Sequence, residues 1–218
     1  MTLIRTSLRA QIKEILLARI LNGEYKPGDR LVELQIAQEF GTSQAPVRES
    51  LRELEALGFV TTEPYRGTRV KEVTKAELSE IYPVRAALEE VAARAAATRL
   101  AGNVEALEAE LDAMRQAAID GNLYEEVRHD VAFHRLIVEA SGNKVLQDVW
   151  KSLRIEARTL ISVLASAIDP GELAELHQPV LEALAEGDGE KAGRLIREHV
   201  EYFGRLVLNS VPKEHSSS

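Results

Sequence analysis

Cysteine is absent from the 218 residues of this chain. Its absence excludes a disulfide framework, a cysteine nucleophile, an iron–sulfur cluster and a thiolate zinc finger. Long apolar runs are missing as well, because no stretch approaches the roughly 18 uncharged apolar residues of a membrane span. Arg5, Arg9 and Lys13 also interrupt the segment where the apolar core of a signal peptide would lie. We therefore expect a cytoplasmic protein with no part in a membrane.

Basic residues are too few to balance the acidic ones, since 27 Lys and Arg against 35 Asp and Glu give a net charge of −8. That charge argues against a nucleic-acid partner, because Lys and Arg supply the contacts to phosphate. The acid is unevenly distributed, however. Residues 1–72 contain 11 Lys and Arg and 10 Asp and Glu, which leaves 16 and 25 for residues 73–218. The length suits two modest domains, of which the first is close to neutral and the second is acidic.

The first part of the chain predicts three helices. Apolar residues at steps of three and four predict helices at residues 7–21, about 34–40, and 44–57. Ser43 is placed as the N-cap of the third helix and Gly58 as its stop. Four apolar residues of this helix should form its buried stripe: Val47, Leu51, Leu54 and Leu57.

A β-hairpin is expected directly after the third helix. Residues 59–62 and 68–70 have the composition of short strands, and the turn residues at 64–67 join them. Three helices followed by a hairpin predict a winged helix-turn-helix domain over residues 1–73.

From residue 74 onward the sequence predicts only amphipathic helices, and the short breaks between them favour antiparallel neighbours. The expected helices span residues 77–100, 104–119, 123–140, 145–168, 171–186 and 189–208. Pro83 should kink or split the first of them. The predicted fold is therefore mainly α, with an all-α antiparallel bundle at residues 74–210 after the winged helix and a disordered tail at residues 211–218.

The N-terminal end of the third helix carries side chains that can enter a DNA major groove. In helix-turn-helix proteins this end meets base edges, while its free N–H groups meet phosphate. Glutamine can pair with adenine, and arginine can pair with guanine. The candidates for base contact are Gln44, Ala45, Arg48 and Arg52, and those for phosphate contact or placement of the wing are Ser43, Arg66 and Arg69. The alternative is an ordinary solvated helix face.

Three segments of the first part resemble a known DNA-binding domain. The segments at residues 28–31, 36–55 and 58–60, with the Pro-Val-Arg-Glu-x-Leu core inside the second, closely resemble the N-terminal domain of the GntR family of bacterial transcriptional regulators. The resemblance spans about residues 5–73, and the wing glycine Gly67 agrees with it. It implies double-stranded DNA as the partner.

The resemblance also assigns roles to single residues. It implies Arg48 as the principal base contact, and it adds Arg30 and Gly67 to the DNA-binding residues. The family often has arginine where this chain has Leu34 and Gln44. The operator is therefore expected to differ from the usual one.

Four of the five histidines lie in the helical part. Asp130 and His134 are four residues apart, so both point from one helix face, and apolar neighbours suggest that His177 and His199 face inward. One aspartate and three histidines suit zinc, nickel or manganese and would leave a coordination position open. Histidines satisfied within the core are the alternative. His129 points about 100° away from Asp130 and is left out of the site.

The helical part resembles the effector-binding FCD domain of the FadR subfamily over about residues 74–210. The resemblance rests on Arg-Ala-Ala-Leu-Glu at 85–89, on Asp130 and His134 at their spacing, and on His177 and His199. It implies that these four side chains hold a divalent metal ion in the centre of the bundle.

An open metal position can take the carboxylate of a small organic acid. Arg85 is the candidate clamp for that effector, because its guanidinium can bind a carboxylate through two hydrogen bonds. The alternative for Arg85 is a surface salt bridge with Glu89 at i+4. Arg154 and Arg158 could also face inward, but a solvated position is at least as compatible with their sequence.

These features predict a ligand-responsive transcription regulator, not an enzyme. It should bind a palindromic operator as a homodimer, because one small helix-turn-helix contacts too few bases. Release of DNA on ligand binding is the commoner outcome in the family, which makes a repressor the expectation. A metal sensor without organic effector and a metal-dependent hydrolytic enzyme are the alternatives.

Overall fold

The computed structural model describes residues 7–21, 23–164 and 174–210. The tail expected at residues 211–218 and the segment 165–173 lie outside these described residues. The chain divides into two units, Met1–Glu72 and Val73–Ser218.

The first unit is a winged helix-turn-helix. Its elements are α1 (Leu8–Leu21), β1 (Arg30–Leu31), α2 (Glu33–Glu39), α3 (Gln44–Leu57), β2 (Val60–Glu63) and β3 (Gly67–Val70). The sheet is antiparallel with the order β1-β3-β2, and Arg30 lies opposite Arg69. The predicted helices and hairpin are present. Strand β1 was not expected, because two residues are too short to give a periodic signal.

Helices α1 and α3 pack against each other and supply half of the buried apolar residues described in this unit. Ile12, Leu16, Val47 and Leu51 are almost fully buried between them. The prediction that Leu57 is buried is wrong, since this last residue of α3 is 42% exposed. The backbone turns away directly after it, because Gly58 adopts the left-handed conformation that ends the helix.

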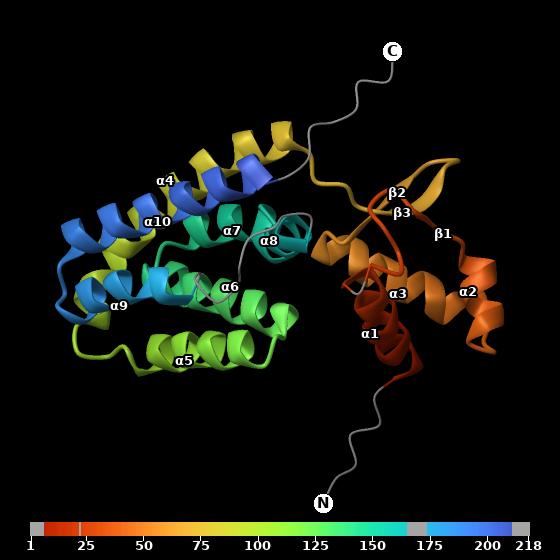
Figure 1. Cartoon of the computed structure of the whole chain (residues 1–218), viewed down its shortest axis with the longest axis horizontal. Helices are drawn as coiled ribbons and strands as arrows, with labels where there is room; N and C mark the ends of the chain where they lie inside the picture. Colours follow the sequence, from red (N-terminus) through yellow and green to blue (C-terminus); the bar gives the residue numbers. More distant parts are fainter. Residues whose placement is uncertain (1–6, 22, 165–173, 211–218) are drawn as a thin grey trace, which may run out of the picture. The chain divides into compact units, whose positions relative to one another are not determined.

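The second unit is built from helices alone. Its elements are α4 (Lys75–Leu100), α5 (Glu105–Ile119), α6 (Leu123–Ala140), α7 (Lys144–Ser152), α8 (Ile155–Leu164), a 3₁₀ helix (Ala174–His177), α9 (Gln178–Ala185) and α10 (Gly189–Ser210). Figure 1 shows α4 and α10 lying side by side along most of their length, with α6 in contact with both α4 and α5. The all-α bundle is therefore confirmed.

Three details of the bundle differ from the predictions. The prediction of a single helix at 145–168 is wrong, because α7 ends before Leu153 and Arg154 has a left-handed φ of 49°. The single helix expected at 171–186 is also wrong within the described residues, since it begins as a 3₁₀ turn at 174–177. Helix α4 continues through Pro83 without a split. Pro83 is exposed, so water can reach the carbonyl group that proline leaves unpaired.

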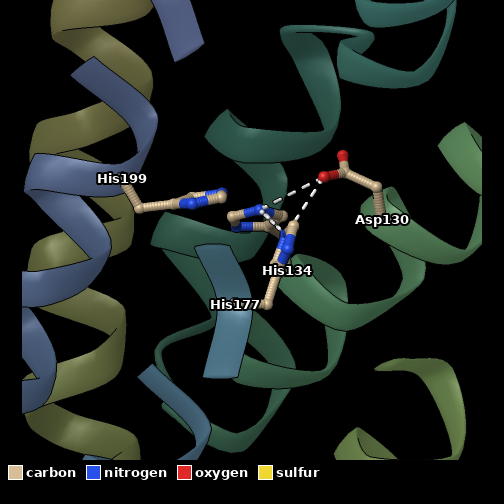
Figure 2. A group of neighbouring side chains, drawn as sticks. All are labelled: Asp130, His134, His177 and His199. Carbon is tan, nitrogen blue, oxygen red and sulfur yellow. Dashed lines mark hydrogen bonds and ion pairs between the residues drawn. The ribbon is translucent and has the colours of Figure 1, made fainter. Parts of the chain in front are cut away.

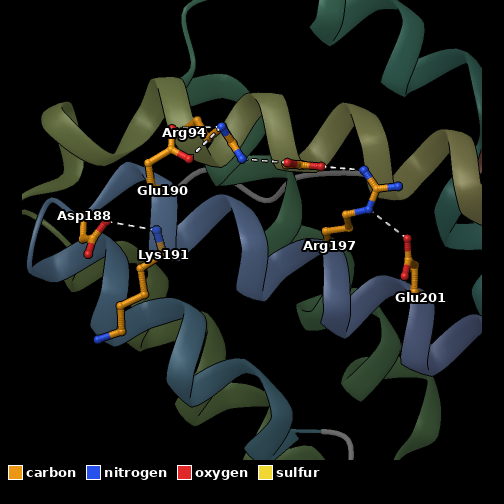
Figure 3. A network of polar contacts seen from close by, with 7 residues as sticks. Arg94, Asp188, Glu190, Lys191, Arg197 and Glu201 are labelled. Carbon is orange, nitrogen blue, oxygen red and sulfur yellow. Dashed lines mark hydrogen bonds and ion pairs between the residues drawn. The ribbon is translucent and has the colours of Figure 1, made fainter.

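Glycines allow α10 to lie very close to α4. A Cβ atom on Gly204 would lie 2.7 Å from Cγ of Tyr82, and one on Gly189 would lie 2.8 Å from the backbone oxygen of Arg94. Glu90 of α4 pairs with Arg94 of the same helix and with Arg197 of α10. Figure 3 shows these two arginines on the neighbouring helices. This close pairing sets the position of His199, which α10 carries between its tight contacts.

Candidate metal centre and DNA-binding surface

Four side chains from three elements converge inside the second unit. Asp130 and His134 come from one face of α6, His177 ends the 3₁₀ helix, and His199 comes from the middle of α10. One ligand atom from each of the four lies within 4.8 Å of the others. Figure 2 shows the three imidazole rings and the carboxylate directed toward one common point. The spacing of Asp130 and His134 that predicted a shared face is therefore realised.

Short distances within this cluster mark the position an ion would take. Nε2 of His177 lies 3.1 Å from Oδ1 of Asp130 and 3.3 Å from Nε2 of His134. Nε2 of His134 lies 3.8 Å from the same Asp130 oxygen. The ring of His199 stacks on that of His134 with 5.1 Å between centroids. Three nitrogen atoms and one oxygen atom thus face each other at distances that a single metal ion can bridge.

Burial and neighbouring charges determine the protonation of these groups. Burial lowers the pKa of His199 well below its ordinary value, and the nearby His177 and His134 lower it further. His199 is therefore neutral, and its Nδ1 is buried without a hydrogen-bond partner among the described residues. Burial would raise the pKa of Asp130, but His177 and His134 outweigh it and hold that pKa below its usual range. A neutral imidazole and an ionised carboxylate are the forms that bind metal.

A buried carboxylate with its own hydrogen-bond donors lies next to His134. Glu89 of α4 is fully buried, and its Oε2 lies 2.6 Å from Nδ1 of His134. Its other oxygen, Oε1, accepts hydrogen bonds from Nε of Arg85 and from Nε1 of Trp150, both at 2.8 Å. Burial would raise the pKa of Glu89, but the charge of Arg85 and the contact with His134 together lower it below its usual range. Glu89 is thus an anion inside the bundle.

Arg85 pairs with Glu89, but not at the surface. Its side chain is only 3% exposed, so the alternative of a surface salt bridge is wrong in its location although right in its partner. The motif at residues 85–89 included Glu89, yet sequence reasoning gave that residue no part in the site. The signal that could have found it was its position four residues after Arg85 in a motif shared with the family.

The space beside the cluster is small. A narrow cavity opens next to Asp130, and its described lining is mostly apolar, with Glu126 and Thr159 as the other polar members. A shallow surface groove on the other side reaches His199 between α10 and α9, past Tyr202. The Asp130 side of the cluster therefore adjoins the narrow cavity, and the His199 side adjoins the surface groove.

The remaining charged candidates of the second unit lie outside the cluster. His129 contacts Glu110 through Nδ1 at 2.6 Å, which agrees with leaving it out of the site. Arg158 is partly buried and donates to Glu77 of α4 at 2.8 Å. Arg154 is exposed at the break between α7 and α8. Neither arginine is one of the cluster's four side chains.

The predicted DNA-binding residues gather on the surface of the first unit. Eight of the nine are exposed: Arg30, Ser43, Gln44, Ala45, Arg48, Arg52, Arg66 and Arg69. The ninth, Gly67, is partly exposed and opens strand β3 of the wing. Ser43 occupies the N-cap position of α3, but its side chain makes no capping hydrogen bond.

Intramolecular partners hold several of these arginines. Glu33 of α2 accepts hydrogen bonds from Nε and Nη2 of Arg48, the shortest at 2.7 Å. Arg69 donates to the backbone oxygen of Gly28 at 2.9 Å, which ties β3 to the turn before β1. Tyr65, at the tip of the wing, is fully exposed with a left-handed φ of 67°.

Comparison with known proteins identifies both units. Residues 8–70 match the family described as "Bacterial regulatory proteins, gntR family", and residues 80–202 match the "FCD domain" family. The chain therefore belongs to the GntR family of bacterial transcriptional regulators and carries an FCD domain, as the resemblance predicted. A winged helix of this family binds DNA, so the first unit is a DNA-binding domain. No helix among the described residues is long and apolar enough to span a membrane.

Individual relatives cover nearly the whole chain. It is 35% identical to the "Probable D-xylose utilization operon transcriptional repressor" of Paenarthrobacter nicotinovorans, over 91% of this chain and 88% of that protein. It is 31% identical to the "HTH-type transcriptional regulator LutR" of Bacillus subtilis (strain 168), over 83% and 92%. Among solved structures, "E. coli McbR/YncC" superposes with a TM-score of 0.72 at 26% identity, covering 94% and 98% of the two chains.

Proposed function

We propose that this protein is a ligand-responsive transcriptional repressor that binds a palindromic operator as a homodimer. In this proposal the second unit holds a divalent metal ion and a small organic acid. The observation that carries the proposal is the convergence of Asp130, His134, His177 and His199 in a chain that also has a winged helix. The 35% identical relative is named a transcriptional repressor, which supports repression as the proposed effect of DNA binding.

The nine predicted DNA-binding residues form the proposed operator surface. Arg48 reads a guanine in the major groove, Gln44 and Arg52 flank it, and the wing contacts phosphate through Arg66 and Arg69. A single such surface reads few base pairs, so two copies related by two-fold symmetry are needed for specific binding.

The metal site has three nitrogen ligands and one oxygen ligand. This set fits zinc, nickel or manganese, and four protein ligands would leave two positions open on an octahedral ion. When bound, the ion would attract an anionic oxygen of the effector. The four side chains would hold that ion, and the cavity next to Asp130, whose lining is mostly apolar, adjoins it.

The effector is proposed to bind beside Asp130, in a cavity that has room for about one water molecule and must therefore widen to admit an organic acid. Its carboxylate would occupy an open metal position, and its hydroxyl groups would meet Thr159 and Glu126 on the cavity wall. Arg85 is the proposed clamp, although its Nε already donates to Glu89. The candidate effectors are small hydroxy acids and dicarboxylic acids. Sugar acids and pentoses are added to them, because one relative is named for a D-xylose utilization operon.

Thermal-shift screening with metal present tests the effector proposal. A ligand that binds only the native state raises the melting temperature, by an amount that grows with its concentration over its Kd. The hit should also release a DNA fragment from the chain's own promoter region in a mobility-shift assay. An acid that raises the melting temperature without changing the DNA shift would contradict the role of effector.

A metal sensor without organic effector is the second candidate, because the same four ligands would serve it. Chelation separates the two. If metal-free protein keeps full operator affinity and metal restores only ligand binding, the sensor is excluded. If metal alone switches operator affinity, the organic effector is unnecessary. A hydrolytic enzyme would leave the winged helix without a purpose, so regulation is favoured.

A further inference from the structure

The fully buried carboxylate of Glu89 is the feature that the proposed function does not explain. It lies on α4, touches no open space, and is not among the four converging ligands. A buried anion costs free energy unless it is paired and hydrogen-bonded. Glu89 is paired twice, since Arg85 lies on its Oε1 side and His134 on its Oε2 side.

The two oxygens of Glu89 have different neighbours. Oε1 accepts hydrogen bonds from Arg85 and Trp150, both at 2.8 Å, so donors already occupy this side. Oε2 lies within ion-pair distance of Nδ1 of His134, at 2.6 Å, and neither of these two buried atoms makes a hydrogen bond among the described residues. The opposite nitrogen of that ring, Nε2, is the one directed at Asp130 and His177. The carboxylate and the ion position thus lie on opposite sides of one imidazole.

We propose that Glu89 is a positioning residue for the metal centre: it holds the proton of His134 on Nδ1 and thereby leaves the Nε2 lone pair free for the ion. The inference rests on the proposed metal site. A carboxylate behind a metal-binding histidine fixes the tautomer and the ring orientation and makes the ligand more basic. Arg85 and Trp150 hold the carboxylate in place by donating to its other oxygen.

Glutamine in place of Glu89 cannot satisfy both sides at once. If its oxygen accepts from Arg85 and Trp150, its NH2 group faces Nδ1 of His134 and favours the tautomer with the proton on Nε2. If the amide is turned around, the NH2 group faces the two donors instead. Each arrangement either blocks the metal-binding nitrogen or opposes like groups in the core.

The test measures zinc and nickel binding by isothermal titration calorimetry in the wild type and in Glu89→Gln. We expect the variant to bind each ion roughly 10- to 100-fold more weakly. Glu110→Gln is the matched control, because Oε2 of Glu110 also lies 2.6 Å from Nδ1 of a histidine, His129, outside the cluster. This control should bind metal like the wild type. Equal affinity of Glu89→Gln and wild type would overturn the inference while leaving the metal site intact.

A second variant separates positioning from packing. Trp150→Phe removes one donor from Oε1 but leaves the contact between Glu89 and His134, so metal affinity should fall less than about threefold. A loss as large as that of Glu89→Gln would show that Glu89 acts only through the packing of α4 against α7. If the wild type itself binds no metal, the proposed metal site fails first.

A measurement on the unmodified chain keeps the inference testable if Glu89→Gln does not fold. Long-range ¹H–¹⁵N correlation spectra of the zinc-loaded protein distinguish a protonated ring nitrogen from a metal-bound one. We expect His134 to carry its proton on Nδ1 and the metal on Nε2. The reverse assignment would overturn the role of Glu89.

Discussion

Arg48 is the residue on which sequence-specific binding is expected to depend, and in the free protein its guanidinium is bound to Glu33. The two side chains are 50% and 28% exposed, so water weakens the pair. The contact nevertheless keeps the guanidinium extended from the N-terminal half of α3, across the gap to α2. Exchange of the Glu33 carboxylate for the edge of a guanine therefore requires little rearrangement.

Replacement of Arg48 by alanine should abolish operator discrimination. A homodimer would lose two base contacts, so specific affinity should fall about 100-fold or more, while binding to unrelated DNA changes little. Fluorescence anisotropy with operator and scrambled fragments measures both. Glu33→Gln is the control, because it removes the negative charge of the intramolecular partner and keeps Arg48, and it should retain discrimination. If Arg48→Ala still distinguishes the operator from the scrambled fragment, Arg48 is not the main base contact.

Replacement of His134 by alanine should remove the metal and leave the DNA-binding unit intact. The metal content, measured by elemental analysis, should fall close to zero, and the melting temperature should fall because a ligand that binds only the folded state is lost. DNA affinity of the metal-free protein should stay within about threefold. His129→Ala serves for comparison, since His129 lies outside the cluster. Unchanged metal content in His134→Ala would refute the site.

Sequence reasoning found the ligands of the centre more readily than their support. The four-residue spacing of Asp130 and His134 fixes their shared face, because side chains at i and i+4 lie on one side of a helix. The convergence of His177 and His199 came from the family resemblance, since spacing cannot show where distant helices meet. The role of Glu89 was not predicted, because the sequence could not show that a carboxylate four residues from an arginine lies inside the bundle.

Among the elements, those with strong periodicity were predicted within a few residues and those set by backbone detail were not. Helices α3 and α6 have the expected bounds. The break between α7 and α8 was missed because Arg154 adopts a positive φ that its sequence does not signal. Strand β1 exists only through pairing with β3, which is a tertiary effect.

The contact between α4 and α10 gives a prediction in which packing opposes helix propensity. Alanine is the better helix former by up to about 1 kcal/mol, so propensity alone predicts that Gly204→Ala stabilises the protein. The added Cβ would instead meet the ring of Tyr82 at 2.7 Å. We expect a destabilisation of about 1–3 kcal/mol, a fall of roughly 2–10 °C in melting temperature.

Calorimetry or circular dichroism measures this fall, and the exposed neighbour Arg205 provides the control. Arg205→Ala should shift the melting temperature by less than about 2 °C. A rise in the melting temperature of Gly204→Ala would mean that α4 and α10 are not in tight contact where Gly204 meets Tyr82.

At the scale of the whole molecule, the net charge of −8 belongs to the second unit. Residues 1–72 have 11 basic and 10 acidic residues, so the DNA-binding unit is close to neutral. The general attraction to phosphate that basic proteins use is therefore weak here. Affinity must come from a few placed side chains, and one copy of the surface supplies too few of them.

A DNA fragment with a single half-site should consequently bind far more weakly than the full palindrome. We expect a loss of at least about 100-fold in the half-site fragment, since half of the base contacts of a dimer disappear while the phosphate contacts add little. Mobility-shift titrations at two salt concentrations measure this loss. The scrambled fragment should bind weakly at both, with a modest dependence on salt because few phosphates are neutralised. Equal affinity for one and two half-sites would argue that a monomer reads the operator, and the proposed homodimer would then be wrong.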